Sequence, residues 1–334
     1  MNNNVYGVDL GTSSIKVFCK TSGKILKEKN AIAVINNHQI YAYGDEAYAM
    51  YEKAPESIEI VFPVTSGVIA DYNYMQDIIL TFFDEKIKGK IRGSEFVVAV
   101  PTDITDVEQR AFYDIFYKSK FRPKNILLCE KPIADAVGLG IDVREPSGVM
   151  IINLGADTTE ISVISMGGLV LSNLLHFGSN RLDESIVSYM RKEFNLVIGL
   201  KTAKTLKETI GSGLPGRTES MNIVGRDVVS GLPIELNVTA EVVYNAIKGN
   251  LESICNSLKI ILEKTPPELA KDIIHTGINI TGGGSLLHNI DKLFEEITGI
   301  KVNTTEAPEE SAVLGLVKIV SDSKFKNLPF TMKK

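Results

Sequence analysis

Cysteine is scarce in this sequence. Three cysteines occur among 334 residues, and Cys19, Cys129 and Cys255 lie far apart in apolar runs. No CxxC pair is present, so the chain lacks the spacing of a cysteine metal site or a dithiol redox site. We expect three reduced, buried thiols, which is typical of a cytoplasmic protein.

Long apolar runs and an excess of positive charge are also missing. The sequence has no run of about 18 apolar residues and no secretory leader, so we expect no membrane-spanning segment. The polar start at 1–4 is too short for an amphipathic membrane anchor. A formal net charge of −5 argues against nucleic acid as the main partner.

The overall composition is that of a globular protein. Hydrophobic residues make up 44% of the chain and charged residues 23%, which are ordinary values for this class. A chain of 334 residues is long enough for two domains of usual size. Strand patterns alternate with helix patterns in both halves, which predicts α/β lobes.

A hairpin-like stretch at 148–163 is the most informative part of the chain. An apolar run at Val149–Ile152 breaks at Gly155-Ala156-Asp157, and strand character returns at Thr159. The tip of such a hairpin presents backbone N–H groups and short hydroxyl side chains, which can hold an anion. One hairpin of this kind is not specific, because a purely structural turn has the same sequence.

The same pattern occurs near the N-terminus, at 5–17. The matched pairs of the two copies are Asp9 with Asn153, Leu10 with Leu154, Gly11 with Gly155 and Ser14 with Thr158. A repeat at half-chain spacing predicts two similar lobes that face each other. Two hairpin tips that meet across a cleft would hold a polyphosphate from both sides.

Three further patterns locate secondary structure. The apolar run Phe96–Val100 before Pro101 predicts a buried strand. Thr105-Asp106-Val107-Glu108 predicts a capping box at the start of a helix. We expect the apolar face of that helix to hold Val107, Ala111, Phe112, Ile115 and Phe116. Pro266-Pro267 should end a long helix that starts at Thr239.

A glycine-rich turn follows the strand pattern at 278–280. Thr281-Gly282-Gly283-Gly284-Ser285 leads into a helix that we expect to begin at about Leu286. Glycines allow the backbone to approach a ligand closely, and a helix N-terminus favours a phosphate. An ordinary tight turn explains the glycines equally well.

Two matching hairpins and one late glycine-rich turn together resemble the superfamily of actin, heat-shock protein 70 and sugar kinases. Within it the chain is similar to the MreB family of bacterial actins, and especially to the MreB paralogues of the wall-less bacterium Spiroplasma. The resemblance covers nearly the whole chain. It is carried by motifs at Gly67–Asp71, Glu130–Ala134, Val224–Asp227, Gly231–Pro233, Thr265–Leu269 and Ile280–Gly284.

The resemblance implies an α/β, actin-like ATPase fold. Two duplicated RNase H-like lobes would each carry a small inserted subdomain, with a nucleotide cleft between them. The implied subdomains are IA (1–30, 62–140 and 310–334), IB (31–61), IIA (141–178 and 239–309) and IIB (179–238).

The resemblance also implies ATP or ADP with Mg²⁺ as the ligands. The implied nucleotide-binding residues are Gly11, Thr12, Ser13 and Ser14 in the first hairpin, Gly155, Ala156, Asp157 and Thr158 in the second, Lys204, Thr205, Leu206 and Lys207 on a helix, and Gly282, Gly283, Gly284, Ser285 and Leu286 in the turn. Asp9 and Asn153 would hold Mg²⁺ through water, since this ion prefers hard oxygen ligands.

The second hairpin departs from the family pattern Asp-Ile-Gly-Gly-Gly-Thr. Asn153 removes one negative charge near the metal, and Asp157 adds one four residues later. Compensation by neutral drift and an altered Mg²⁺ geometry are both consistent with this change. Lys204 stands where the family usually has Glu, which puts the implied ribose contacts in doubt.

A third departure bears on hydrolysis. Related proteins have Glu-Glu-Pro, in which the second acid orients the attacking water, whereas this chain has Glu130-Lys131-Pro132. A protonated lysine cannot accept a proton, although it can pair with a phosphate as a point charge. A neutral lysine base would need heavy burial. The candidate catalytic positions are therefore Lys131, Glu130 and Thr158, with neutral variation at Lys131 as the alternative.

The expected function is a cytoplasmic, nucleotide-binding filament protein with weak ATPase activity that serves cell shape or helical-cell motility. The expected partners are further copies of itself and other MreB paralogues. Two basic, partly apolar segments, Lys86–Arg92 and Lys324–Lys334, suggest contact with an anionic membrane at the inner face of the cell. A solvated loop and a tail whose aromatic residues pack on the body are the alternative.

Two other classes are weighed against this reading. A heat-shock-protein-70 chaperone would need a substrate-binding domain, which we do not expect after the helix that holds Leu314–Val320. A small-molecule kinase would need a catalytic aspartate in the cleft. Asp135 and Asp183 are the candidates, although both read as ordinary carboxylates.

Overall fold

The two main sheets of the protein share one topology. The computed structural model describes residues 4–36, 39–87 and 91–332. Its first five-stranded sheet has the order β10-β9-β1-β2-β3, and its second has the order β13-β12-β11-β17-β18. In each sheet an antiparallel meander carries two parallel strands beside its first strand. The predicted duplication of the lobes is therefore confirmed.

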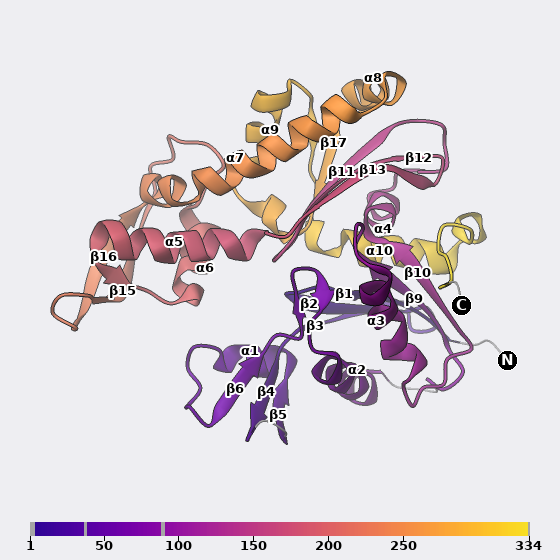
Figure 1. Cartoon of the computed structure of the whole chain (residues 1–334), viewed down its shortest axis with the longest axis horizontal. Coiled ribbons are helices and arrows are strands. Elements are labelled where there is room, and N and C mark those ends of the chain that lie inside the picture. The colour runs from indigo at the N-terminus through magenta and orange to yellow at the C-terminus, as the bar shows by residue number, and fades with distance from the viewer. Residues whose placement is uncertain (1–3, 37–38, 88–90, 333–334) are drawn as a thin grey trace.

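The strands of the first sheet are β1 (Val5–Leu10), β2 (Ser14–Cys19), β3 (Lys24–Lys29), β9 (Glu95–Val100) and β10 (Asn125–Glu130). Those of the second are β11 (Val149–Leu154), β12 (Thr159–Ser165), β13 (Gly168–Leu175), β17 (Ile278–Thr281) and β18 (Val302–Asn303). In Figure 1 the second sheet lies above the first, and both chain ends lie at the right of the view.

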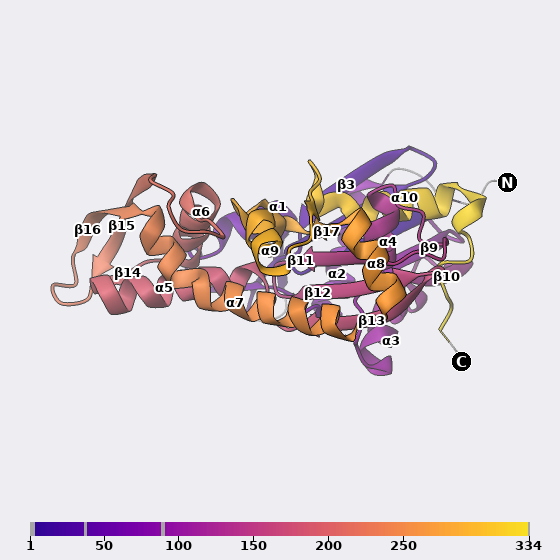
Figure 2. The same ribbon diagram turned by 90° about the horizontal axis from the view of Figure 1, so that it is seen from above.

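Each lobe carries a smaller three-stranded sheet on the side away from the chain ends (Figure 1). The first lobe has β4 (Ile32–Ile35), β5 (Gln39–Tyr43) and β6 (Ile58–Val61), followed by the hairpin of β7 (Val64–Thr65) and β8 (Val68–Ile69). The second lobe has β14 (Leu196–Val197), β15 (Ser220–Asp227) and β16 (Pro233–Thr239). Seen from above, the sheet of β14–β16 is the part of the molecule farthest from the N-terminus (Figure 2).

Ten α-helices cover these sheets within the described residues. They are α1 (Gly44–Met50), α2 (Tyr72–Lys86), α3 (Asp106–Tyr117), α4 (Lys131–Gly138), α5 (Ser179–Phe194), α6 (Leu200–Ile210), α7 (Ala240–Lys264), α8 (Pro267–Thr276), α9 (Ile290–Thr298) and α10 (Ser311–Ser321). None of the helices in this part of the chain is long and apolar enough to span a membrane.

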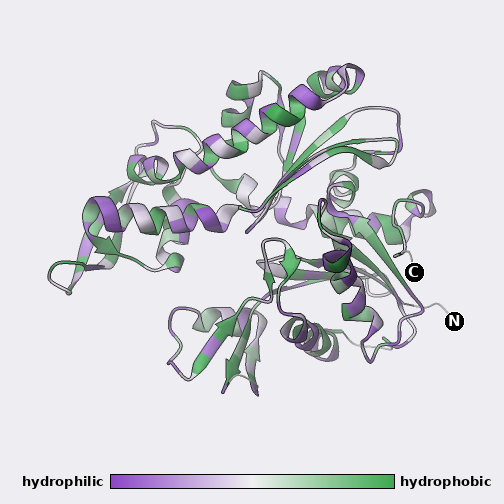
Figure 3. Cartoon of the chain, in the orientation of Figure 1, coloured by the Kyte–Doolittle hydropathy of each residue, from purple (hydrophilic) through white to green (hydrophobic). Residues whose placement is uncertain are grey.

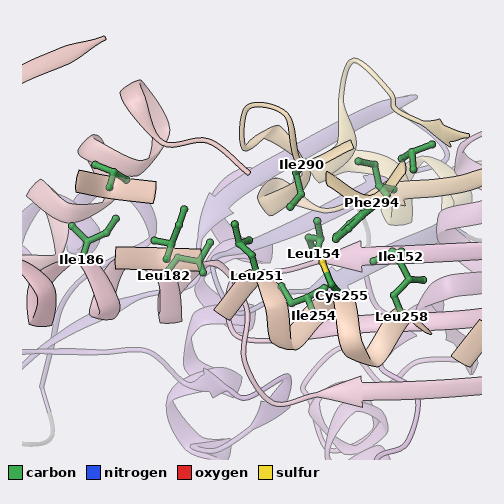
Figure 4. Packing of buried hydrophobic residues seen from close by; sticks show 14 of the residues in the cluster. Ile152, Leu154, Leu182, Ile186, Leu251, Ile254, Cys255, Leu258, Ile290 and Phe294 are labelled. Carbon is green, nitrogen blue, oxygen red and sulfur yellow. The ribbon is translucent and has the colours of Figure 1, made fainter. Parts of the chain in front are cut away.

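Helix α7 shows how the pattern of the sequence becomes packing. Its hydrophobic residues recur at helical spacing, so hydrophilic and hydrophobic colours alternate along it in Figure 3. In Figure 4, Leu251, Ile254 and Leu258 point from α7 toward Ile152 and Leu154 of β11. The helix ends at Lys264, directly before the predicted stop at Pro266 and Pro267, because proline has no N–H to continue the hydrogen bonding.

The predicted capping box of α3 is present, and one residue of its predicted face is not. The Thr105 side chain accepts from the Glu108 backbone N–H, and Glu108 accepts from the Thr105 N–H. Phe112, Ile115 and Phe116 are buried, whereas Val107 is 79% exposed. At about 100° per residue, Val107 lies about 140° around the axis from Phe112. The assignment of Val107 to the core was therefore wrong.

Two helices between the sheets join the lobes. Helices α4 and α10 pack so closely that a side chain at Gly138 would meet the backbone of Ser311, and one at Gly315 would meet the backbone of Ala134. Their shared core includes Val97 from the first sheet and Ile151 from the second. The two lobes therefore meet at a hydrophobic cluster that is separate from the core of each lobe, and the start of α4 belongs to it.

The C-terminal segment packs on the body of the first lobe. Phe325 is 5% exposed, and the backbone of Phe330 exchanges two hydrogen bonds of 2.8 Å with Leu128 on β10. Covering an edge strand in this way blocks its unpaired N–H and C=O groups. The arrangement supports the alternative in which the tail packs on the body. In the other basic segment, 88–90 lie outside the described residues.

The three cysteines agree with their prediction. Cys19, Cys129 and Cys255 are buried, and none forms a disulfide.

Candidate functional site

A cavity lies between the two lobes, where the hairpin tips and the glycine-rich turn meet. Its volume is about 1170 Å³ when the adjoining open solvent is included. Of the predicted site residues, those that line it are Asp9, Gly11, Thr12, Ser13, Ser14, Lys131, Asn153, Gly155, Ala156, Thr158, Lys204, Lys207, Gly282, Gly283 and Gly284.

The two hairpin tips have the same geometry. The Gly11 N–H donates to the Ser14 carbonyl at 3.1 Å, and the Gly155 N–H donates to the Thr158 carbonyl at 2.8 Å. A Cβ at Gly155 would lie 2.8 Å from that carbonyl oxygen, which explains the need for glycine. The residue pairs matched in the sequence are therefore equivalent in space.

Asp157 faces away from this cavity. Its carboxylate accepts from the Ser66 backbone N–H at 3.1 Å and from the Asn180 side chain at 2.7 Å. Ser66 belongs to the turn between β7 and β8 in the first lobe, so Asp157 ties the second hairpin to the opposite lobe. The Asp157 carboxylate therefore forms a contact between the lobes. Asp157 lines a neighbouring cavity and not the one between the hairpin tips.

Asp9 is the most strongly paired acid in the cavity. Its Oδ2 lies 3.2 Å from the Lys16 ammonium, and its Oδ1 lies 3.1 Å from the Lys131 ammonium. Burial alone would raise the pKa of Asp9, but Lys131 and Lys16 outweigh it and lower this pKa to about 2. Asp9 is therefore ionised, and both of its oxygens have a cationic partner.

Lys131 is the first residue of α4, and its side chain is 21% exposed. Burial opposes its charge, but the carboxylates of Asp9 and Asp135 raise the pKa of Lys131 above its usual value. The ammonium is therefore protonated and cannot act as a general base. Glu130 is only half-buried and does not line the cavity.

Asp135 of α4 and Glu160 of the second lobe are held by hydrogen bonds. The Asn153 side-chain amide donates to Asp135 Oδ2 at 2.6 Å, and burial raises the pKa of Asp135 to about 7. Glu160 accepts from the Thr102 backbone N–H at 2.6 Å and also from the Thr102 hydroxyl. Burial raises the pKa of Glu160 as well.

This donor set does not fit a Mg²⁺ ion. Both Asp9 oxygens face lysines, and Asn153 turns its N–H₂ group toward Asp135. Among residues 4–36, 39–87 and 91–332, no three His, Cys, Asp or Glu side chains are grouped so that they could hold a metal ion. A cation at Asp9 would have to displace a lysine.

Helix α6 presents two of its four predicted residues to the cavity. Lys204 and Lys207 line it, whereas Leu206 is fully buried in the core. The Thr205 hydroxyl donates to the Lys201 carbonyl at 2.9 Å. Four consecutive residues of a helix point in four directions, so they cannot all face one cavity.

Asp183, one of the two candidates for a kinase's catalytic aspartate, is paired with Lys207. The Lys207 ammonium lies 2.7 Å from Asp183 and also donates to the backbone and side chain of Ser179. Asp183 is thus a buried ion-pair partner, and it does not line the main cavity. Asp135 does line it, with one oxygen held by Asn153.

The glycine-rich turn differs from its prediction. Gly282 has φ 78°, and a short 3₁₀ helix spans Gly283–Leu286. Asn289 is left-handed, so α9 starts at Ile290 and not at Leu286. The Ser285 hydroxyl donates to the Gly282 carbonyl at 2.7 Å, and Leu286 is 60% exposed. Neither of these two residues lines the cavity.

Several residues that line the cavity were missed. Among them are Lys16, Lys29, Glu160, Ser179, Asn180, Glu208, Pro308 and Glu309. The repeat itself contained a signal for two of them, because Lys16 is paired with Asp9 as Glu160 is paired with Asn153. The remainder come from segments that no motif connects to the hairpins.

Residues at the end of α1 contact the start of α6 across the two lobes. Glu52, after α1, accepts from the backbone N–H groups of Leu200 and Lys201 at 2.7 and 3.0 Å. The Lys201 ammonium donates to the Tyr48 and Ala49 carbonyls at 2.9 and 3.2 Å. The start of α6 therefore receives a carboxylate, and the end of α1 receives a cation, as the helix dipoles favour.

Comparison with known proteins identifies the family. The family model described as MreB/Mbl protein matches residues 3–327. The chain belongs to the MreB/Mbl family. It is 36% identical to the cell shape-determining protein Mbl of Bacillus subtilis, over 92% of this chain and 93% of that protein. It is 34% identical to the cell shape-determining protein MreB of Escherichia coli, over 92% and 90% of the two chains.

Solved structures agree with this MreB/Mbl assignment. MreB 5 of Spiroplasma citri bound to AMPPNP has a TM-score of 0.92 and 32% identity, and the match covers 98% of both chains. The MamK double helical filament has a TM-score of 0.80, covering 96% of this chain and 99% of that one. At 20% identity the second likeness concerns the fold alone. The predicted actin-like fold and the predicted family are both confirmed.

The contact at Glu52 predicts a change in local stability. Glu52→Ala leaves the N–H groups of Leu200 and Lys201 without their charged acceptor, and such hydrogen bonds contribute about 1.5–3 kcal/mol. We expect amide hydrogen exchange at these two residues to become about tenfold faster or more, measured by mass spectrometry on fragments covering 199–202. Glu56→Ala, at an exposed glutamate nearby, is the matched control. Equal exchange in both variants would contradict the contact.

Proposed function

We propose that this chain binds ATP or ADP between its lobes and polymerises as a bacterial cytoskeletal protein. The observation that carries the proposal is the pair of equivalent hairpin tips that face one lysine-lined cavity. Its Spiroplasma citri relatives bound to AMPPNP and to ADP support a nucleotide as the ligand. Relatives described as cell shape-determining proteins support the cytoskeletal role.

The proposal assigns the phosphates to the hairpin tips. Residues with hydroxyl or ammonium groups line the cavity at and near these tips, namely Thr12, Ser13, Thr158, Lys16 and Lys131. The nucleoside would lie toward Lys204 and the turn at 282–284. We keep the four-subdomain division proposed from the family resemblance, with the cleft between IA and IIA. A Mg²⁺ ion held by Asp9 and Asn153 is not included, because lysines already contact that carboxylate.

Hydrolysis in this chain should be weak. Catalysis of phosphoryl transfer depends on orienting water and on placing charge. The position that orients water in related proteins is Lys131, which is protonated and paired with Asp9. This residue can stabilise phosphate charge, but it cannot accept a proton from water. The chain should therefore hold ATP for long periods.

The filament proposal includes further copies of this chain and other MreB paralogues as partners, with a role in cell shape or helical-cell motility. Co-polymerisation of a labelled paralogue with this chain tests whether paralogues are partners. Loss of cell helicity after depletion of the protein tests the role in cell shape or motility. A paralogue that stays entirely in the supernatant would exclude mixed filaments.

Contact with an anionic membrane at the inner face of the cell is proposed for the basic segment 86–92 alone. The aromatic residues of the tail are packed on the body, so a chain that ends at Ser323 should bind anionic liposomes as well as the full chain. Replacing Lys86 and Arg92 with glutamine should reduce binding at low salt. Co-sedimentation measures both, and binding by none of the proteins would exclude the membrane.

Nucleotide-dependent polymerisation is the direct test of function. The wild-type chain should pellet with ATP, and Thr158→Glu should abolish both nucleotide binding and pelleting, since it adds bulk and negative charge at the second hairpin tip. Thr218→Glu, at an exposed threonine outside the cavity, is the control. Affinity for ATP retained in Thr158→Glu would remove the two-hairpin site, and a monomeric wild-type protein with ATP would remove the filament.

Lys131→Glu should increase hydrolysis. The substitution restores an acid at the water-orienting position and removes the ammonium from Asp9. We expect phosphate release to rise several-fold, since a tenfold change needs only about 1.4 kcal/mol of barrier. Release is measured with excess ATP and Mg²⁺ and compared with Lys124→Gln, an exposed lysine at the other end of β10. Unchanged release would show that Lys131 does not limit the reaction.

A further inference from the structure

The cleft holds two lysines on a single carboxylate. Asp9 is the penultimate residue of β1, Lys16 lies opposite it on β2 in the antiparallel register, and Lys131 starts α4. The three side chains are 4%, 7% and 21% exposed. The two ammonium groups and one carboxylate of this trio carry a net positive charge. Two further acids, Asp135 and Glu160, also attract the Lys131 ammonium, but burial raises the pKa of both and so favours their neutral forms. A charge so shielded from water is expensive unless a ligand or partner offsets it.

Besides Asp9, the acid of this part of the cavity with an unpartnered oxygen is Asp135, whose Oδ1 has no hydrogen-bond partner. Burial raises the pKa of Asp135 to about 7, which makes it a weaker ligand for a divalent cation than an ordinary carboxylate. Asn153, the equivalent of Asp9 in the second lobe, is neutral and donates to Asp135. Glu160, the equivalent of Lys16, is turned toward Thr102. Mg²⁺ usually binds one or two carboxylates, together with water and the phosphates of its substrate. Here Asp9 is paired with lysines, Glu160 is hydrogen-bonded to Thr102, and Asp135 has one oxygen held by Asn153.

We propose that Lys16 and Lys131 together replace the divalent cation at this site, so that the chain binds a nucleoside triphosphate without Mg²⁺. Two ammonium groups carry the same formal charge as one Mg²⁺ ion, and lysine contacts phosphate as a point charge. Asp9 then holds both ammonium groups beside the phosphate-binding hairpin and takes no part in metal binding. The inference rests on the proposed nucleotide binding and extends it to the charge that neutralises the phosphates.

The two lysines belong to different elements of the fold, Lys16 to β2 and Lys131 to α4. Lys16 is fixed by its register opposite Asp9 within one hairpin, so it is present whenever the first lobe is folded. Lys131 comes from the helix that packs against α10 between the lobes. Removal of Lys131 should therefore leave the hairpin intact while it halves the cationic charge, which makes Lys131 the better position for a test.

The test compares ATP affinity in excess Mg²⁺ with that in excess EDTA, for the full chain, by calorimetric titration. We expect the wild-type dissociation constants to agree within about threefold. In Lys131→Gln, chelation should weaken binding by about tenfold or more, and added Mg²⁺ should restore it. Lys124→Gln removes an ion-paired lysine from the far end of β10 and should behave as wild type. Melting temperatures without nucleotide confirm that each variant folds.

The possible results distinguish a failure of the inference about Mg²⁺ from a failure of the proposed nucleotide binding. Wild-type binding that is tight in Mg²⁺ and lost in EDTA would overturn the inference and leave the nucleotide site standing. A Lys131→Gln protein as insensitive to EDTA as wild type would overturn the role of Lys131. Absence of ATP binding under both conditions would overturn the proposed function itself. Nucleotide-linked thermal stabilisation with and without EDTA gives an independent readout of the same comparison.

Discussion

The close packing of α4 on α10 is the constraint on which the rest of the structure depends. Gly138 and Gly315 let the two backbones touch, and no larger residue fits at either position. Because the two sheets pack around this helix pair, the distance between the hairpin tips is set there. The same packing brings Lys131, the first residue of α4, to Asp9 of β1. The pairing of Lys131 with Asp9 therefore depends on how α4 packs against α10.

The charged groups buried in and beside the cleft have partners within the protein. Asp9 is paired with two lysines, Asp183 with Lys207, and Glu160 with Thr102. A buried ion pair adds little net stability, because desolvation offsets most of the attraction. Such pairs hold side chains in fixed positions instead. In this chain they hold ammonium groups beside a cavity that is suited to an anion.

The second lobe repeats the first in backbone and differs from it in charge. Asp9 and Lys16 of the first hairpin correspond to Asn153 and Glu160 of the second. Of the equivalent residues Lys16 and Glu160, the cation therefore lies in the first lobe and the acid in the second. The duplication supplies two hairpins of one shape, and the substitutions make them chemically different. The same mechanism, divergence within a repeat, accounts for Asp157, which contacts the opposite lobe through Ser66.

Much of this protein could be predicted from its sequence, because the informative features are local. A hairpin tip, a capping box and a proline stop each depend on a few neighbouring residues, so the two hairpins, the start of α3 and the end of α7 were all correct. Predictions failed where direction around a helix mattered. Val107, Thr205 and Leu206 lie on helices that were located correctly, but their side chains point elsewhere.

The sequence by itself determined the duplicated fold and the hairpins that face the cleft, since a repeat and its turns are written in adjacent residues. Tertiary structure alone decided which side chains meet there. Lys131 comes from helix α4 and Asp9 from strand β1, and Glu52 reaches the start of α6 from the opposite lobe. Contacts of this kind depend on how sheets and helices pack in space, and no spacing along one chain encodes them.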